Sequence, residues 1–184
     1  TNANDGPVAQ DGAFTVDEGE THLGNVLGSD IDSSTLTYAV VGTGATTNGT
    51  VVVNSDGSFT YTHNGSETIT DSFEFTVSDG TATDTGLVVI TVTPKNDAPV
   101  AVDDAYNTNE DTIITVVAAL GVLSNDTDAE GDSLTATKLT NPANGTLIYF
   151  NANGSFRYRP NANFHGTDSF TYKATDSSGA FTTA

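Results

Sequence analysis

A six-part internal repeat divides the 184-residue chain into two similar halves. Asn-Asp-Gly-Pro-Val-Ala at 4–9 returns about ninety residues later as Asn-Asp-Ala-Pro-Val-Ala at 96–101. Five more blocks recur in the same order, pairing 27–32 with 123–128, 36–37 with 134–135, 48–50 with 144–146, 57–59 with 154–156 and 71–73 with 168–170. Chance does not preserve such an order, so the sequence predicts two copies of one module.

The pattern within each copy is typical of short strands. Aromatic or aliphatic residues alternate with polar ones over 73–77 and again over 170–174, which predicts strands that bury one face. Asn-Gly and Asp-Gly turns punctuate the strands at 48–49, 56–57, 144–145 and 153–154. This spacing of strands and turns predicts an all-β fold of two tandem Greek-key β-sandwiches, with about seven strands each.

The repeat also sets the expected boundaries. We expect a first sandwich over 1–94, a linker over 95–99 and a second sandwich over 100–184. The first copy closes with the apolar run 87–92, and the second has no complete equivalent after 180–184. The second sandwich is therefore predicted to lack its last strand. Truncation is the simpler explanation, although an incomplete sandwich also leaves a sheet edge that a strand of another chain can join.

The composition excludes several classes of function. The chain has 24 Asp and Glu against 5 Lys and Arg, a formal net charge of −19, so it offers no basic surface for nucleic acid. It contains no cysteine, which leaves calcium rather than disulfides or thiolate-bound zinc as the available staple. No apolar run reaches the length of about 20 residues that crosses a bilayer, so direct membrane insertion is not expected.

Acidic residues concentrate where loops are predicted. Residues 125–132 hold four carboxylates and one glycine, and such close charges repel one another unless a cation with six to eight oxygen ligands lies between them. An EF-hand is excluded, because Thr137 stands where its bidentate Glu is needed and no helices flank the loop. The Asp-x-Asp spacing recurs at Asp30 and Asp32. We therefore predict bound Ca²⁺, with a solvated acidic turn as the alternative.

At these residues the chain resembles a known family. The stretch 96–99, the pair Asp126 and Asp128, and the stretch 170–179 resemble the linker, Asp-x-Asp and Asp-x-Gly motifs of cadherin repeats. The second half is closer still to the cadherin-like and immunoglobulin-like repeats of giant bacterial adhesins, the extender modules of VCBS or RTX-adhesin type. The motifs that carry this closer resemblance are 110–111, 121–126, 131–132, 144–147 and 166–172.

The resemblance implies a calcium site at the junction, since cadherins bind calcium between consecutive modules. Its implied ligands come from the first module, the linker and the second module, with Asp132 in support: Glu18, Asp71, Asn96, Asp97, Asp126, Asp128, Asp132 and Asp176. Half-sites toward further modules are implied at Asp30, Asp32, Asp79, Glu110 and Asp168. Pro94 and Ala98 replace two cadherin linker ligands, so fewer ions are expected here than in a cadherin junction.

The function that the resemblance implies is a calcium-rigidified extender or cell-adhesion module of a large bacterial adhesin, secreted or displayed on the cell surface, as in biofilms. Its partners would be neighbouring repeats of the same chain, and surface glycans or adhesin repeats on other cells.

Two other classes of function compete with the adhesin. An enzyme is not expected, because His22, His63 and His165 are scattered over separate blocks and lie in no catalytic motif; we expect His63 and His165 to cap or line turns. The alternative is a carbohydrate-binding module that uses the aromatic segments 149–150 and 156–158. Residues 156 and 158 share one face of a strand, a pattern more typical of core.

Overall fold

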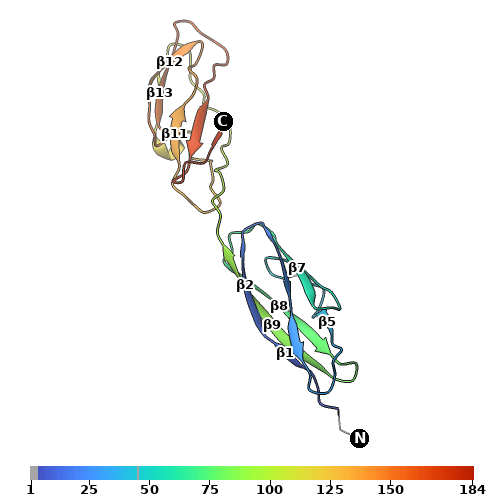
Figure 1. Cartoon of the computed structure of the whole chain (residues 1–184). Coiled ribbons are helices and arrows are strands. Elements are labelled where there is room, and N and C mark those ends of the chain that lie inside the picture. The colour runs from blue at the N-terminus through green and yellow to red at the C-terminus, as the bar shows by residue number, and fades with distance from the viewer. Residues whose placement is uncertain (1–3, 45) are drawn as a thin grey trace. The chain divides into compact units, whose positions relative to one another are not determined.

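Strands form nearly all the regular structure in the computed structural model, which describes residues 4–44 and 46–184 (Figure 1). The chain divides into two units, Thr1–Lys95 and Asn96–Ala184, which we call the first and second modules. The expected linker residues 96–99 belong to the second unit, where the Pro99 side chain is fully buried. The prediction of two tandem all-β sandwiches is confirmed.

The described residues of the first module form nine strands: β1 (Val8–Gln10), β2 (Gly12–Asp17), β3 (Thr21–Asn25), β4 (Leu27–Ser29), β5 (Thr37–Val40), β6 (Gly49–Val53), β7 (Ser58–His63), β8 (Thr70–Ser78) and β9 (Thr83–Thr93). One sheet has the order β2-β9-β8-β5, the other has the order β3-β7-β6, and β1 pairs with β4. Figure 1 shows β2, β9 and β8 side by side.

Strand β9 holds the first module together. It pairs with β8 in antiparallel fashion from Thr83 to Thr91, and its residues Val88–Thr93 pair with β2 in parallel. Its side chains alternate strictly, so that Val88, Ile90 and Val92 enter the core with at most 3% exposure. They pack there with residues of both sheets: Val16, Val26, Val51, Phe59, Tyr61, Phe73 and Phe75. Burial of this apolar surface is the main stabilising term of the module.

The second module repeats this plan with shorter strands: β10 (Ile114–Val116), β11 (Thr135–Lys138), β12 (Gly145–Phe150), β13 (Phe156–Pro160), β14 (Tyr172–Thr175) and β15 (Phe181–Thr183). Its sheets have the orders β10-β13-β12 and β11-β14-β15, and a 3₁₀ turn, η1 (Ala118–Leu120), lies after β10. The buried core is smaller: Val116, Val122, Ala136, Phe156, Tyr172 and Ala174.

Strand β15 is the counterpart of the start of β9. The Ala101 N–H donates to Oγ1 of Thr182 at 2.9 Å, as the Ala9 N–H donates to Oδ2 of Asp84 at 2.8 Å. Thr182 therefore stands where Asp84 stands, two residues before Gly86. Within the described residues, β15 corresponds to the start of β9, so the second sandwich does contain a strand at the position that was expected to be empty.

Candidate metal site

The first residues of the second module fold back onto two of its own acidic loops. The Asn96 side-chain amide donates to Oδ2 of Asp176 at 2.8 Å, and the Asp97 backbone N–H donates to Oε1 of Glu130 at 2.8 Å. The neighbours Asp128 and Asp132 lie in the loop of Glu130. We call the following residues the acidic cluster of the second module: Asn96, Asp97, Asp128, Glu130, Asp132 and Asp176.

Asp176 is the most buried member of this cluster, with 6% exposure. Its Oδ1 accepts hydrogen bonds from the Gly179 and Ala180 backbone N–H groups at 2.7 and 2.9 Å, and from Oγ of Ser178 at 2.9 Å. The Asn96 amide and these donors hold the pKa of Asp176 below its ordinary value. The side chain is therefore a preoriented carboxylate that stays charged at neutral pH.

Asp128 carries the feature that fits a cation best. Its Oδ1 accepts the Asp132 N–H at 3.0 Å, but its Oδ2 is buried and has no hydrogen-bond partner in the part of the chain that the structure describes. A buried carboxylate oxygen without a partner is costly. Hard oxygen ligands of this kind are what Ca²⁺ prefers. The free oxygen of Asp128 therefore fits a calcium ligand.

The first module builds the same arrangement at its own N-terminal end. The Asn4 amide donates to Oδ2 of Asp79 at 2.8 Å, and the Asp5 N–H donates to Oδ2 of Asp32 at 3.2 Å. Asp30 accepts two backbone N–H groups of its own loop at Oδ1, at 2.9 and 2.8 Å. Its Oδ2, like that of Asp128, is buried without a partner among the described residues.

The strand register corrects the sequence alignment of these loops. Val8 pairs with Ser29, and its counterpart Val100 pairs with Thr127. Asp30 therefore corresponds to Asp128 and not to Asp126. In the same way, the counterpart of Asp32 in the second module is Glu130. Aligning the blocks on Leu-x-x-Asp hid two inserted residues and left Glu130 out of the predicted ligands. The Val-Ala dipeptides at 8–9 and 100–101 mark where the pairing begins. An alignment that starts from these dipeptides would have matched Asp32 with Glu130.

Asp126 lies deeper in the module. Its Oδ1 accepts the Val102 N–H at 2.9 Å, and both of its oxygens lie 3.0 Å from the hydroxyl of Tyr172, a side chain with 3% exposure. In the first module the corresponding segment is a backbone ladder in which Gln10 pairs with Leu27. Asp126 thus replaces a ladder acceptor and ties the loop to the core.

Asp104 lies close enough to Asp126 to feel its charge. Its Oδ2 is buried and without a hydrogen-bond partner in the described residues. Burial raises the pKa of Asp104 to about 6, and the charges of Asp126 and Asp103 add to this rise. Above pH 6 Asp104 is charged in the folded module, and its burial then lowers the free energy of unfolding.

We expect Asp104→Asn to stabilise the second module at pH 7.5 in the presence of chelator. The folded pKa exceeds the ordinary 3.8, so the contribution of this acid is complete below pH 4 and is lost as pH rises through about 6. Because the group is partly exposed, the expected gain is about 1 kcal/mol rather than the full linkage value. Calorimetric unfolding at pH 5 and 7.5 measures this gain in the free energy of unfolding. If stability changed between pH 5 and 7.5 by the same amount in the variant as in the wild type, the raised pKa of Asp104 would be contradicted.

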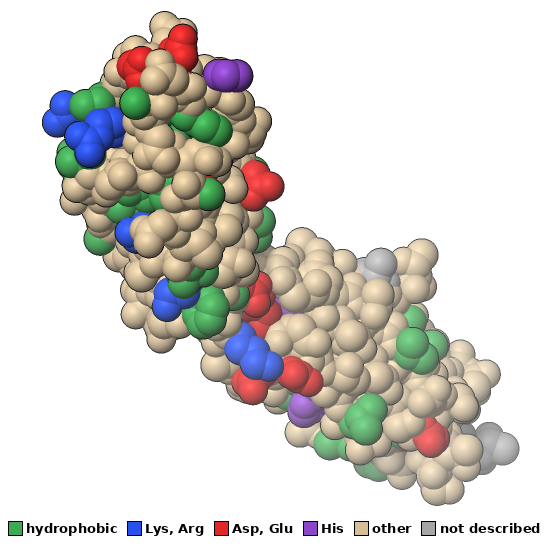
Figure 2. All heavy atoms as spheres, turned by 90° about the horizontal axis from the view of Figure 1, so that it is seen from above, with side chains coloured by type: hydrophobic (Ala, Val, Ile, Leu, Met, Phe, Trp, Pro, Cys, Tyr) green, Lys and Arg blue, Asp and Glu red, His purple; other side chains and the backbone are tan. Residues whose placement is uncertain are grey.

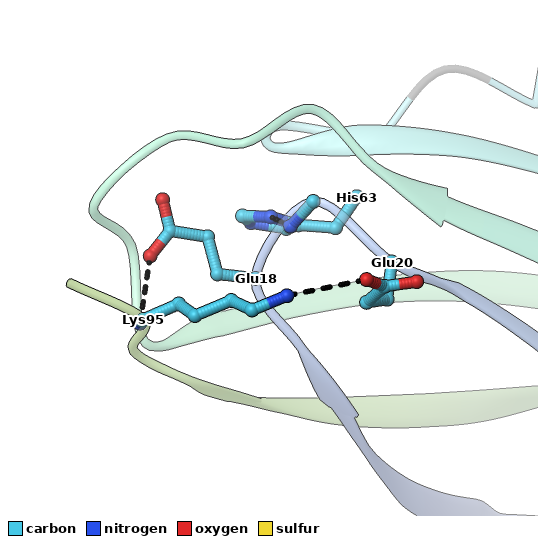
Figure 3. A network of polar contacts seen from close by, with 5 residues as sticks. Glu18, Glu20, His63 and Lys95 are labelled. Carbon is cyan, nitrogen blue, oxygen red and sulfur yellow. Dashed lines mark hydrogen bonds and ion pairs between the residues drawn. The ribbon is translucent and has the colours of Figure 1, made fainter. Parts of the chain in front are cut away.

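Glu18 lies where β2 ends, beside the end of β9. Its backbone N–H donates to the Thr93 carbonyl at 3.0 Å, and its Oε2 accepts the Lys95 N–H at 3.1 Å. The Lys95 ammonium pairs with Glu20 at 3.3 Å (Figure 3). Glu18 has 7% exposure and places a carboxylate oxygen within 4.8 Å of one from Glu67. Glu18 and Glu67 therefore lie close together in the first module. Glu18 is bonded to Lys95, the last residue of that module.

Asp71 accepts hydrogen bonds from four groups of the first module. Its Oδ2 accepts Oγ1 of Thr46 at 2.5 Å, the Asn48 N–H at 3.2 Å and the Tyr61 hydroxyl at 2.8 Å, and its Oδ1 accepts the Ser72 N–H at 2.9 Å. Burial opposes the charge of Asp71, but these hydrogen bonds outweigh it and keep its pKa below the ordinary value. The four donors occupy the lone pairs of the carboxylate.

The second module repeats this polar anchor at Asp168. Its oxygens accept the Ala143 and Asn144 N–H groups, both at 2.9 Å, and the Tyr158 hydroxyl at 2.8 Å. Burial and the neighbouring carboxylate raise the pKa of Tyr158 to about 12. Sequence repetition alone did not distinguish these anchors from ligands, because both are paired acids at block boundaries.

Among the described residues, the exposed aromatic side chains do not gather on one sheet. Phe156 has 2% exposure, and Tyr158 faces Asp168. Tyr149 and Phe181 are the aromatic residues among the exposed large hydrophobics of the described chain, and they lie on strands of different sheets. On the face in Figure 2, acidic, basic and apolar side chains form small separate groups.

His63 and His22 have structural surroundings, whereas His165 is exposed. His63 has 2% exposure, and its Nδ1 accepts the Gly19 and Gly65 N–H groups, each at 3.2 Å. This confirms the expectation that His63 lines a turn. The His22 ring stacks on Phe14 with centroids 4.0 Å apart.

Comparison with known proteins identifies the fold and family. The model of the bacterial cadherin-like domain matches the chain twice, over 4–94 and 96–184. A search of curated proteins finds no match. Among the described residues, no helix has the length and hydropathy of a membrane span.

Solved structures similar to the chain include cadherin repeats. The two-domain EC1-2 fragment of human protocadherin-24 is 21% identical over 98% of this chain and 93% of that one, with a TM-score of 0.62. Drosophila N-cadherin EC1-4 is 13% identical over 98% of this chain and 48% of that one, with a TM-score of 0.61. These two matches show the fold alone. An endo-fucoidan hydrolase of glycoside hydrolase family 107 is 25% identical with a TM-score of 0.43, and the chain spans 28% of its length.

Proposed function

The chain belongs to the bacterial cadherin-like domain family, which it represents twice, and from this premise we propose that it is a calcium-rigidified extender of a large bacterial adhesin, secreted or displayed on the cell surface. Cadherin-like domains are extracellular adhesion modules that associate with neighbouring repeats, and enzymatic activity is not typical of them. The proposed cofactor is Ca²⁺, and the proposed partners are adjacent repeats.

The observation that carries the proposal is the buried, unpartnered Oδ2 of Asp128, in the acidic loop that the residue after Asn96 contacts, while Asn96 itself contacts the preoriented carboxylate of Asp176. A solvated acidic turn, the competing explanation, does not require a buried oxygen without a partner. The same oxygen is orphaned at Asp30 in the first module. Its recurrence at corresponding positions supports a built-in cation site rather than an accident of one loop.

We assign the ligands of the junction to both modules. The second module would contribute Asp97, Asp128, Glu130 and Asp176, with Asn96 and Asp132 orienting them. The first module would contribute Glu18, with Glu67 beside it. We assign Asp71 and Asp126 structural roles, since each accepts the hydroxyl of a buried core tyrosine, Tyr61 and Tyr172 respectively.

The calcium ion would supply a crosslink. Glu18 is bonded to Lys95, and Asp176 is bonded to the next residue, Asn96. The two groups of proposed ligands are therefore connected through a single peptide bond. Without the ion, mutual repulsion of the carboxylates favours separation of the modules. With the ion, its binding free energy stabilises one relative orientation. Extracellular calcium suffices for sites of modest affinity, with dissociation constants of about 10⁻⁴–10⁻³ M.

We expect calcium to narrow the distribution of distances between the two modules. Fluorophores attached at Leu23→Cys and Ile148→Cys, both exposed positions, would report this distribution by single-molecule energy transfer. The measurement compares millimolar calcium with excess chelator, and millimolar magnesium serves as the control ion.

A narrow distribution in calcium alone supports the rigid extender. Equal widths in calcium and chelator would refute it, and would leave the acidic residues as a solvated surface of a flexible spacer.

A further inference from the structure

The sheet β10-β13-β12 of the second module carries two arginines on its outer face. Arg157 and Arg159 lie two residues apart on β13, and Phe156 and Tyr158, which alternate with them, pack in the core. Because side chains alternate along a strand, both guanidinium groups belong to the opposite side of the sheet, with their Cα atoms about 7 Å apart. Arg159 is exposed and Arg157 is half-buried.

The fold makes no use of these two guanidinium groups. All three lysines have a partner within the chain: Lys95 with Glu20, Lys138 with Asn141, and Lys173 with the ring of Phe181. Neither arginine side chain has a hydrogen bond or an ion pair with any described residue, although the chain contains 24 acidic residues. The Nε of Arg157 is even buried without an acceptor in the described chain. The two arginines therefore remain free for a ligand.

The first module shows that this sheet does not require arginine. Residues 57–59 correspond to 154–156, so Thr60 and Thr62 of β7 stand where Arg157 and Arg159 stand on β13. Both strands are the central strand of a three-stranded sheet, β7 between β3 and β6, and β13 between β10 and β12. Since the same sheet forms with threonine at both positions, packing does not explain the arginines.

The neighbours of the arginines are uncharged and carry hydroxyl groups. Arg157 pairs with Tyr149 on β12 and with Thr115 on β10, and Arg159 pairs with Thr146 on β12. Tyr149 is 37% exposed, so its ring and hydroxyl are accessible. We call these five residues the arginine face. Guanidinium groups bind carboxylates and similar oxyanions through two parallel hydrogen bonds, and the hydroxyl groups beside them can bond polar groups of the same ligand.

The size of the arginine face indicates the class of its ligand. Three strands about 4.8 Å apart and about five residues long cover about 250 Å². A stable protein–protein interface needs about 800 Å² from each partner, which exceeds this area. An acidic peptide gains its affinity from main-chain bonds to a sheet edge, but β13 is a central strand whose backbone already pairs on both sides. A short stretch of an acidic sugar polymer needs neither a large area nor a free edge.

We propose that the arginine face binds an acidic polysaccharide. Carboxylate or sulfate groups of the polymer bind Arg157 and Arg159, and its hydroxyl groups bond the side chains of Tyr149, Thr115 and Thr146. This inference goes beyond the extender function, because it gives the second module a ligand of its own. It does not depend on the calcium ion, since none of these five residues belongs to the acidic cluster.

The test measures the binding of three polymers of matched length to the 184-residue chain by titration calorimetry. Oligogalacturonate carries carboxylates, dextran sulfate carries sulfates, and neutral dextran carries neither. Physiological ionic strength screens general attraction between exposed charges. Excess chelator prevents calcium from bridging the polymer to the acidic cluster, so that the result is independent of the proposed calcium junction.

The variant Arg157→Thr with Arg159→Thr installs the residues of the first module, so we expect it to fold. Its affinity for the acidic polymers should fall about tenfold for each arginine lost. A second variant, Arg157→Lys with Arg159→Lys, keeps the charges without the planar fork and should also bind more weakly. The matched control, Lys138→Thr with Lys173→Thr, removes two charges from the other sheet and should bind as the wild type does.

Loss of binding in both arginine variants and its retention in the control support the proposal, and the polymer that binds identifies the anion as carboxylate or sulfate. Absence of binding to both acidic polymers, equal binding by either arginine variant, or equal affinity for neutral dextran overturns it. Sedimentation of the chain alone examines the competing occupant. Self-association that the threonine variant loses, without polymer binding, would make the arginine face a contact between copies of the chain instead.

Discussion

Replacing Asp128 with Asn and Glu130 with Gln in the same chain should remove most of the stabilisation that calcium confers on the second module. If calcium is present at about 100 times its Kd, binding adds about 2.7 kcal/mol to the free energy of unfolding. For a module of this size that corresponds to a rise of about 10–20 °C in unfolding temperature. The double variant removes the negative charge of Asp128, whose Oδ2 has no hydrogen-bond partner among the described residues, and that of Glu130, which accepts the Asp97 N–H. Scanning calorimetry in millimolar calcium and in excess chelator measures the difference.

A matched control removes the same number of charges elsewhere. Glu74 and Asp103 are exposed acidic residues outside the acidic cluster, so Glu74→Gln with Asp103→Asn should retain the full calcium response. Asp126→Asn should lower stability equally in calcium and in chelator, because Asp126 bonds Val102 and Tyr172 within the module. An unchanged calcium response in the Asp128 and Glu130 variant would remove these two residues from the site.

The sandwich fold was predictable because its signals are local. Alternation over 73–77 fixes which side chains face the core, and the Asn-Gly and Asp-Gly turns mark the hairpins. The ordered blocks then double this information.

The site was less predictable because ligand identity depends on register across strands. The pairing of Val8 with Ser29 and of Val100 with Thr127 moves the match by two residues, and a linear comparison of acidic motifs does not contain this information. Similarly, no pattern in the sequence distinguishes a carboxylate that faces solvent from Asp71, whose acceptors are occupied by residues as distant in sequence as Thr46. Glu67 lies in no repeated motif, and its proximity to Glu18 follows only from the folded loop.

Replacing Asp71 with Asn should destabilise the first module to the same extent with and without calcium. The amide removes the charge that four hydrogen bonds stabilise, and if its NH₂ takes the place of Oδ2 it faces donors from Thr46, Asn48 and Tyr61. Loss of hydrogen bonds to a buried charged group costs about 1.5–3 kcal/mol. The unfolding temperature of the first module should therefore fall by about 10 °C. Calorimetry of the variant in calcium and in chelator measures how far the unfolding temperature falls and whether the fall is the same in both conditions.

Acid titration and a second variant separate this anchoring role from metal binding. The lowered pKa of Asp71 means that its contribution is complete above its ordinary value of 3.8 and is lost as pH falls through the folded pKa, so the unfolding curves of the wild type and the Asn variant should converge below pH 4. Asp168→Asn should produce a smaller loss in the second module, because Asp168 is only half-buried. An Asp71 variant that keeps its stability in chelator but loses the calcium response would instead make Asp71 a ligand, and would bring its loop into the junction.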